Sequence, residues 1–184
     1  MLTRRRLALT AAGLLAAPAI VTTARAQAPA DSSLATIDAL LSTLYGVISG
    51  PAEQPRDWDR FRGLFWPGAR LMPLAPDRSG GMRPQPISPD SFAAEADRAF
   101  RTVLAGRGFF ETETARRTER FGALAHVFSR YDNRFAAGDA TPSAQGINSL
   151  QLAFDGQRWW ILGIAWQEAG PNASLPPDGL PPAE

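Results

Sequence analysis

The chain after residue 108 alternates between apolar and polar positions with a period of two, which is typical of strands. Four strands are predicted, over residues 109–121, 123–135, 146–154 and 159–168. The first two turn near Gly122, and the last two form a hairpin around Asp155-Gly156, a dipeptide that favours tight turns. The pattern therefore predicts a long antiparallel meander.

The residues before this meander follow a helical period instead. Apolar side chains recur at three- and four-residue steps over residues 34–48, after N-cap candidates at residues 31–33 and before the helix-ending Gly50. A second, short helix is predicted to start after Asp57, a residue type that favours the N-cap position. Both helices present one apolar face, which indicates that they pack against the meander.

A third helix is predicted from Ser88, an N-cap residue followed by Pro89 at the first helical position. A short strand at residues 69–74 and a Pro/Gly/Arg-rich loop at residues 76–86 precede it. The order is helix, helix, strand, helix and four strands, which indicates one α+β domain.

The chain divides into four parts. Residues 4–6 are arginines, residues 7–21 are uncharged and rich in Ala and Leu, and residues 24–26 form an Ala-x-Ala cleavage site, which together indicate an export signal. Five prolines without periodicity near the C-terminus indicate disorder. We assign residues 1–26 to a signal peptide, 27–33 to a linker, 34–168 to the folded domain and 169–184 to a Pro-rich disordered tail.

The signal resembles the twin-arginine type, because Thr3 precedes the arginines and the apolar Leu7 follows them. An ordinary secretory signal is the alternative. After cleavage behind Ala26, no apolar run approaches the ~20 residues that a membrane-spanning helix needs. We therefore expect a mature protein that is periplasmic or secreted and that is not held in a membrane.

Composition excludes several kinds of site. The chain has no cysteine, which rules out disulfides, thiolate metal sites and cysteine nucleophiles. The signal removes four arginines and no acid, which leaves 15 basic against 18 acidic residues and a net charge of −3. That balance, with no basic run, argues against nucleic acid as a partner. With one histidine and no carboxylates at ligand spacing, we expect no metal and no cofactor.

Both faces of the final hairpin are apolar, so each needs a cover. A loop at residues 155–158 pairs Phe154 with Trp159 and fixes the two faces. One face then carries Asn148, Gly163, Ala165 and Gln167, and the other carries Gln151, Trp160, Leu162, Ile164 and Trp166. The helices cover the first face, and we expect a second copy of the chain to cover the other in a two-fold homodimer. For Trp160 and Trp166, packing within the core and a wall that stacks against a ligand are the alternatives.

Small residues lie among large ones on the helix-facing side of this hairpin. Gly163 and Ala165 leave room there, and the amides of Asn148 and Gln167 lie beside them. Small residues with a few polar groups are typical of a strand that lines a ligand cavity. The alternative is that helix side chains fill the space and that the amides bond to the backbone.

The single histidine, His126, lies in the middle of a predicted strand. It is a candidate general acid or base, or else a partly buried histidine bonded to a neighbour. With a tight turn at Phe121-Gly122, Glu113 shares the face of His126 and lies opposite Arg130. Glu113 is therefore either the acid–base partner of His126 or the partner of Arg130 in a cross-strand ion pair.

The chain resembles the nuclear transport factor 2-like superfamily, in its SnoaL-like and ketosteroid-isomerase-like branch. The resemblance rests on the element order and on five motifs, and two of these resemble a bacterial subgroup with no settled function. These motifs are Leu64-Phe65-x-Pro67, Ala69-Arg70-Leu71, residues 121–129 (FGALAHVFS), residues 146–149 (GINS), and Asp155-Gly156-x-x-Trp159-x-Ile161. It implies a cone in which a curved antiparallel sheet wraps around three N-terminal helices, with a pocket at one end.

Enzymes of this superfamily use acid–base residues inside the cone, and some of these lie on the first helix. The resemblance therefore adds Asp38 and Tyr45 to the candidate site residues by their location on the first helix. Trp58 is expected in the core or at the rim of the pocket. We expect an exported protein that binds a small, largely apolar molecule. A cofactor-free lyase or isomerase that uses His126 with Glu113 or Asp38 is one alternative, and a non-catalytic dimeric interaction module is another.

Overall fold

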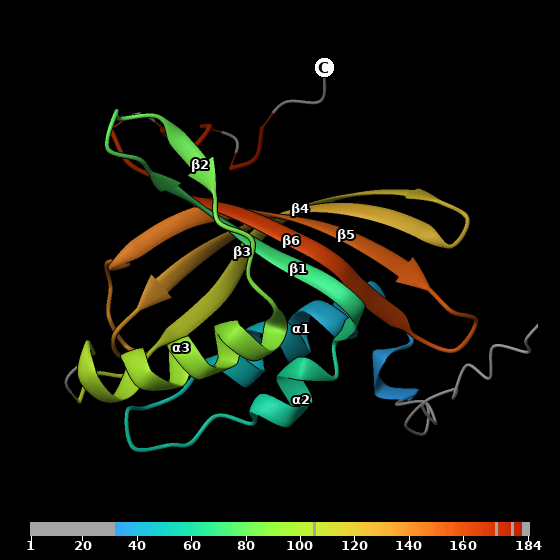
Figure 1. Ribbon diagram of the computed structural model, residues 1–184, viewed down its shortest axis with the longest axis horizontal. Helices are drawn as coiled ribbons and strands as arrows, with labels where there is room; N and C mark the ends of the chain where they lie inside the picture. The colour runs from blue at the N-terminus through green and yellow to red at the C-terminus, as the bar shows by residue number, and fades with distance from the viewer. Residues whose placement is uncertain (1–31, 105, 172, 178, 182–184) are drawn as a thin grey trace, which may run out of the picture.

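The computed structural model describes residues 32–104, 106–171, 173–177 and 179–181. Three helices lie on one side of a curved six-stranded sheet that does not close into a barrel (Figure 1). The helices are α1 (Ile37–Ile48), α2 (Trp58–Arg62) and α3 (Pro89–Thr102), and a 3₁₀ turn (Ser32–Leu34) precedes them. The predicted signal peptide lies outside the described residues. No helix in the described ranges is long and apolar enough to cross a membrane.

Local capping explains where the helices begin. The side chain of Asp57 accepts a hydrogen bond from the backbone N–H of Arg60, and that of Ser88 accepts one from Ser91, which confirms both predicted N-caps. The first helix starts later than predicted, because Thr36 is its cap. The predicted cap region forms the separate 3₁₀ turn.

The strands are β1 (Phe65–Pro76), β2 (Met82–Pro84), β3 (Phe110–Phe121), β4 (Leu124–Arg134), β5 (Ala144–Phe154) and β6 (Trp159–Glu168). Their order across the sheet is β2-β1-β6-β5-β4-β3. The α+β cone is as predicted, but the sheet is mixed, because β1 runs parallel to β6. Between β1 and β6 the chain passes through β2, α3 and the strands β3 to β5, which is more than the long connection that a parallel pair requires. The predicted loop at residues 76–86 contains the short strand β2, paired with the end of β1.

Besides an irregularity of β1 between Phe65 and Arg70, two register shifts decide which side chains of the last four strands face the helices. The first lies in β3, where Glu113 pairs with Tyr131 but Ala115 pairs with Arg130, so Thr114 is the extra residue. The second lies in β6, where Ile161 pairs with Leu152. The next pair joins Gly163 to Gln151, so Leu162 is the extra residue. An extra residue in a strand moves every later side chain to the opposite face relative to its partner strand.

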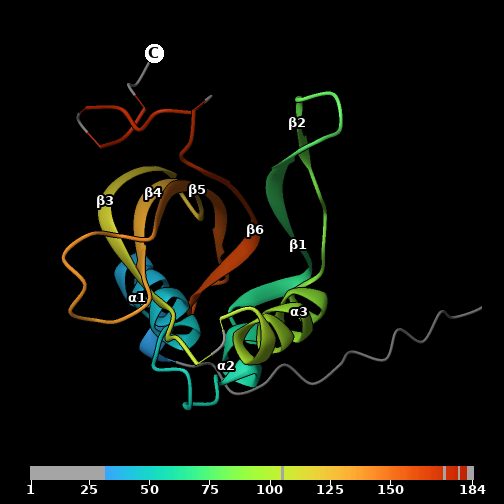
Figure 2. The same cartoon turned by 90° about the vertical axis from the view of Figure 1, so that its left-hand side faces the viewer.

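The core lies between the concave face and the helices. Leu40 and Leu41 of α1 are fully buried against Val127, Leu150 and Ile161 of the sheet. Strand curvature wraps this face around α1, as the end-on view shows (Figure 2). Burial of this kind supplies the main driving force for folding.

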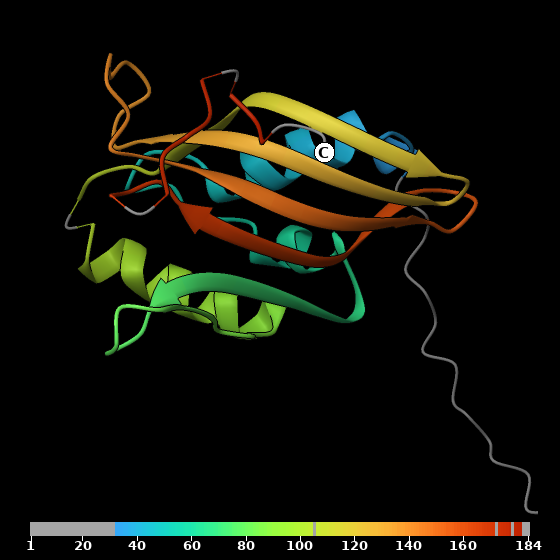
Figure 3. The ribbon, with the colours of Figure 1, turned by 90° about the horizontal axis from the view of Figure 1, so that it is seen from above.

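The C-terminal segment, which we define as the described residues from 169 to 181, lies on the outer face of the sheet, opposite the helices (Figures 2 and 3). The sequence predicts disorder here. In the structure Leu175 and Leu180 are half-buried, and the guanidinium of Arg117 donates a hydrogen bond to the Pro181 carbonyl. Two leucines and one charged anchor therefore hold a Pro-rich segment that has no periodicity of its own.

Candidate functional site

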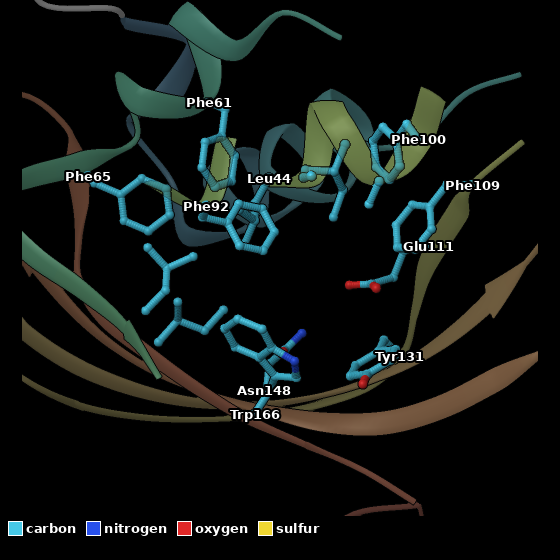
Figure 4. Close-up of a pocket in the computed structure, with 15 residues that line it drawn as sticks. Leu44, Phe61, Phe65, Phe92, Phe100, Phe109, Glu111, Tyr131, Asn148 and Trp166 are labelled. Carbon is cyan, nitrogen blue, oxygen red and sulfur yellow. The ribbon is translucent and has the colours of Figure 1, made fainter. Parts of the chain in front are cut away.

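A cavity of about 280 Å³ lies between the concave face of the sheet and the helices. Its lining is mostly apolar, and aromatic rings come from α2, α3, β1, β4 and β6 and from Phe109 (Figure 4). It is lined by Leu44, Ile48, Phe61, Phe65, Leu71, Phe92, Ala96, Ala99, Phe100, Phe109, Glu111, Tyr131, Asn148, Ile164 and Trp166. A few polar groups in an apolar cavity are the usual composition of a small-molecule site.

Glu111 places a carboxylate in this cavity (Figure 4). The hydroxyl of Ser49 at the end of α1 fixes its backbone, because it accepts from the Glu111 N–H at 2.9 Å and donates to the Glu111 carbonyl at 3.2 Å. Among the described residues, none forms a hydrogen bond or ion pair with the Glu111 carboxylate. Burial raises the pKa of Glu111 to about 7, because the charged form loses its hydration in the cavity.

Tyr131 and Asn148 also bring polar groups to the lining. Burial raises the pKa of Tyr131, and the charge of Glu111 raises it further, so the phenol stays protonated at neutral pH. The side-chain amide of Asn148 donates to the Tyr45 hydroxyl at 3.0 Å. The cavity therefore combines one acidic group with a phenol and an oriented amide.

A chain of hydrogen bonds leads from Asn148 away from the cavity. The Tyr45 and Ser129 hydroxyls lie 2.6 Å apart, and Ser129 donates to Glu113 at 2.5 Å. Arg116 donates to Glu113 and also to Asp38. Burial raises the pKa of Tyr45, while its hydrogen bonds to Ser129 and Asn148 oppose the rise. The chain fixes the orientation of the Asn148 amide.

The bulge at Thr114 makes this chain of hydrogen bonds possible. In a regular strand Glu113 and Arg116 lie on opposite faces, because side chains alternate. The extra residue puts both on the concave face, with their side chains about one-fifth exposed. Glu113 therefore carries its charge beside a guanidinium, whereas Glu111 on the same face has no such partner.

The structure brings some of the sequence candidates together. Asn148 lines the cavity, and Tyr45, Glu113 and Asp38 follow it in the hydrogen-bond chain. Asp38 itself is largely exposed. Trp58 packs against the rings of Phe61 and Phe100, and its indole N–H donates to Asp97 at 3.2 Å, outside the cavity lining.

His126 does not converge with Glu113. It lies on the outer face, where its Nε2 is 3.0 Å from the Ser149 hydroxyl and its Nδ1 is 3.7 Å from the Glu119 carboxylate. The prediction that Glu113 and His126 share a face is wrong, because the bulge at Thr114 turns Glu113 to the concave face. The expected pairs are also wrong, since the turn consists of Gly122-Ala123 and Glu119 lies opposite His126.

The second bulge overturns the predicted faces of β6. Beyond Leu162, Ile164 pairs with Leu150 and Trp166 pairs with Asn148, so Ile164 and Trp166 line the cavity. Gly163, Ala165 and Gln167 consequently lie on the outer face, opposite Gln151, Ser149 and Ile147. The gap expected at Gly163 and Ala165 is therefore on the other side of the sheet from the helices.

Glu111 is the functional residue that sequence reasoning missed. Glu111 and Glu113 alternate in a strand rich in charged residues, and the pattern contains no sign of their different environments. The apolar pair Phe109-Phe110 directly before Glu111 is the one signal that points to burial of this end of the strand.

Comparisons with known proteins support the fold. No protein-family model matches the chain, and no curated protein matches it. A Mycobacterium tuberculosis protein of unknown function is 16% identical, over 72% of this chain and 74% of that one, with a TM-score of 0.52. A putative calcium/calmodulin-dependent protein kinase type II association domain from Thiobacillus denitrificans is 9% identical, over 74% and 98% of the two chains, with a TM-score of 0.52.

A third solved structure is an NTF-2-like protein of unknown function from Silicibacter pomeroyi, 16% identical over 72% of this chain and 92% of that one, with a TM-score of 0.47. Identities this low show the fold alone. With three helices against a curved six-stranded sheet, the chain has the nuclear transport factor 2-like cone fold that the sequence predicts, and its activity has to be argued from its own residues.

Proposed function

We propose that this protein binds a small, largely apolar molecule in the cavity, with one hydrogen-bond donor of the molecule directed at Glu111. The observation that carries the proposal is the unpartnered Glu111 carboxylate in an apolar space of about 280 Å³. Binding sites of this kind use apolar walls for affinity and one or two polar groups for orientation. Tyr131 and the fixed Asn148 amide supply the remaining polar contacts.

The energetics favour a bound donor. A carboxylate without a partner in an apolar site loses its hydration, which is the reason for the raised pKa of Glu111. A ligand hydroxyl or N–H restores a hydrogen bond to the charged group, worth roughly 1.5–3 kcal/mol. A purely apolar ligand leaves the carboxylate without a partner and gains only from burial of its surface.

The test is native mass spectrometry of the mature protein purified from the periplasm of its own cell, with a titration of the apolar alcohol 1-naphthol. The matched variant is Ala96→Phe, which fills the cavity from α3. We expect a retained small molecule, or a 1-naphthol binding event, in the unmodified protein that is absent from Ala96→Phe. An empty protein whose 1-naphthol binding equals that of Ala96→Phe would contradict the proposal.

A second candidate function is acid–base catalysis by Glu111, as a cofactor-free isomerase or lyase. The pKa of about 7 favours it, because a general base works best when its pKa lies near the working pH. The outer-face position of His126 removes that residue from this role. Tyr131 and Asn148 are the groups that would stabilise a developing oxyanion.

Proton abstraction can be measured without knowledge of the natural substrate. The α-protons of 2-tetralone, an apolar bicyclic ketone, exchange with D₂O in a reaction that NMR follows directly. We expect the unmodified protein to accelerate this exchange and Glu111→Gln to lose most of the acceleration while it still binds the ketone. Equal exchange rates in the two proteins would leave the binding function and remove the catalytic one.

We also propose export, which the residues before Ser32 support only through their sequence. Arginines at positions 4–6, the apolar run at 7–21 and the cleavage site at 24–26 are the supporting features. Replacement of Arg4 and Arg5 by Lys should block a twin-arginine route and leave a secretory route active. Fractionation and the mass of the mature N-terminus distinguish these results from retention in the cytoplasm.

A homodimer through the outer face is proposed on a row of apolar residues at the hairpin end of the sheet. Phe121 pairs with Leu124, Leu124 with Ala153, and Ala153 with Trp160, so the four share a face. Trp66 continues the row, with its ring 5.4 Å from that of Trp160. Phe121 is 88% exposed, Leu124 51% and Trp66 41%, which is unusual for such side chains.

This row replaces the interface predicted from the sequence. Two of the five residues expected there, Ile164 and Trp166, face the cavity instead. Light scattering of the mature protein should give the mass of a dimer, and Leu124→Arg should give that of a monomer. A monomer without any substitution would contradict the proposal.

A further inference from the structure

The C-terminal segment is held on the outer face at both ends. After β6 a tight turn joins Gly170 to Ala173 through two backbone hydrogen bonds. At the far end Arg117 donates to the Pro181 carbonyl. Between these anchors Gly179 is buried, and a Cβ there would lie 3.4 Å from the Arg130 guanidinium and 3.5 Å from the Ala115 side chain. The segment therefore lies closely against the sheet near residue 179.

Elsewhere the same segment leaves a space between itself and the sheet. A second cavity of about 320 Å³ lies there, within the usual size range of ligand pockets, about 300–1,000 Å³. Phe128, Ile147 and Ala165 line it from the sheet, and Ala173, Leu175 and Pro181 line it from the C-terminal segment. The small side chains of Ala165 and Ala173 leave the space open.

The polar side chains in the lining of this cavity are Ser149, Gln167, Glu168 and Ser174, and Ser149 is the one that comes from the middle of the sheet. Ser149 lines it, and the Ser149 Oγ lies 3.0 Å from His126 Nε2. The Glu119 carboxylate, 3.7 Å from His126 Nδ1, favours the tautomer with its proton on Nδ1. In that tautomer Nε2 is an acceptor, so the Ser149 hydroxyl donates to His126 and keeps its own lone pairs for another donor.

We propose that this outer cavity is a second ligand site, for a small apolar molecule that carries one hydroxyl group. The apolar body lies between the sheet and the C-terminal segment, and the hydroxyl donates to Ser149. The side-chain amide of Gln167, in the same lining, is placed to complete the contact with the hydroxyl oxygen. Ser149 and Ala165 pair directly with one another in the sheet, so the polar anchor and the open space are adjacent.

The site is separate from the cavity on the concave face. Neighbours along β5 show the separation, because Asn148 lines the inner cavity and Ser149 lines the outer one. A single layer of sheet separates the two cavities, and Trp166 contributes to both linings. Occupancy of each site can therefore be removed by a substitution on its own face.

The experiment is calorimetric titration of the full mature chain with 1-naphthol and with its methyl ether, 1-methoxynaphthalene, which lacks the donor. Ala165→Phe fills the outer cavity, Ser149→Val removes its acceptor, and Ala96→Phe fills only the inner cavity. We expect one binding event that survives Ala96→Phe, is lost in Ala165→Phe and is weakened about tenfold in Ser149→Val or with the ether.

Loss of all 1-naphthol binding in Ala96→Phe, together with unchanged binding in Ala165→Phe, would overturn the proposal and leave the inner site intact. Binding that disappears only in Ala165→Phe would support the outer site and contradict the inner one. Should Ala165→Phe unfold, as circular dichroism would show, Ser149→Val decides the question. Equal affinity of that variant and the unmodified protein for 1-naphthol would overturn the proposal.

Discussion

The two faces of this sheet share the same backbone but differ in how they treat charge. On the concave face the Glu111 carboxylate lies in an apolar cavity without a partner, and burial raises its pKa to about 7. On the outer face His126 lies between two partly exposed side chains. The Ser149 hydroxyl is within hydrogen-bond distance of it, and the Glu119 carboxylate lies 3.7 Å away. The raised pKa of the isolated Glu111 carboxylate makes the concave face the candidate for acid–base chemistry.

A second contrast lies within the concave face. Glu113 is two residues from Glu111, yet Arg116 and Ser129 surround its carboxylate. The Glu113 carboxylate joins β3 to β4 through Ser129, whereas the Glu111 carboxylate has no such partner among the described residues. The following substitutions test this contrast and that between the two faces.

The largest expected effect separates the faces at adjacent residues of β5. Leu150 is fully buried on the concave face, and Gln151 is exposed on the outer one. Leu150→Ala should lower the free energy of unfolding by about 2–5 kcal/mol through lost burial and a new cavity. Gln151→Ala should change it by less than about 0.5 kcal/mol. Urea denaturation measures both, and equal losses would contradict the assignment of the faces.

Glu111→Gln should stabilise the protein above neutral pH. The pKa of Glu111 is raised from 4.5 to about 7 by burial, so between these values the carboxyl is protonated when folded and ionised when unfolded. Stability therefore falls as the pH rises through this window and is level above it. The penalty at pH 8 is on the order of 3 kcal/mol, and Glu111→Gln should remove most of it. Urea denaturation at pH 5 and pH 8 measures the change.

Glu113→Gln is the matched control, with the opposite sign. It removes the charge that faces Arg116 and weakens the hydrogen bond from Ser129, at a cost of about 1–3 kcal/mol. Stabilisation by both substitutions would show that the two carboxylates share one environment, against the structure.

The smallest expected effect concerns the C-terminal segment. Gly179 has a φ of +86°, so Gly179→Ala should cost about 1 kcal/mol and loosen the segment. Gly138 has no atom within 4 Å of an added Cβ, which makes Gly138→Ala the control. Hydrogen exchange of residues 173–181 should rise in the first variant only. Equal protection in both would contradict the close contact at Gly179.

The sequence predicts the elements of this fold well and the faces of its strands poorly. Helix starts depend on local chemistry, such as the Asp57 and Ser88 caps, and that chemistry is visible in the chain. Strand faces depend on the register over a dozen residues. Single extra residues at Thr114 and Leu162 reverse that register without a mark in the pattern.

The consequence for the site is specific. Asn148 lies on β5, which contains neither bulge, and it lines the cavity on the face that the sequence predicts. Gly163, Ala165 and Gln167 lie beyond Leu162 and move to the outer face, whereas Trp166 moves inward. Glu111 was missed because its environment depends on α1, α3 and β4, which only the folded chain brings together.

The most direct test of the central claim is ¹³C NMR titration of the side-chain carboxyls, with Glu111 identified by its absence from Glu111→Gln. The account predicts a titration midpoint near pH 7 for Glu111, since its carboxylate lies in an apolar cavity without a partner. A midpoint near the ordinary glutamate value of about 4.3 would show a hydrated carboxylate, and it would contradict the apolar binding site.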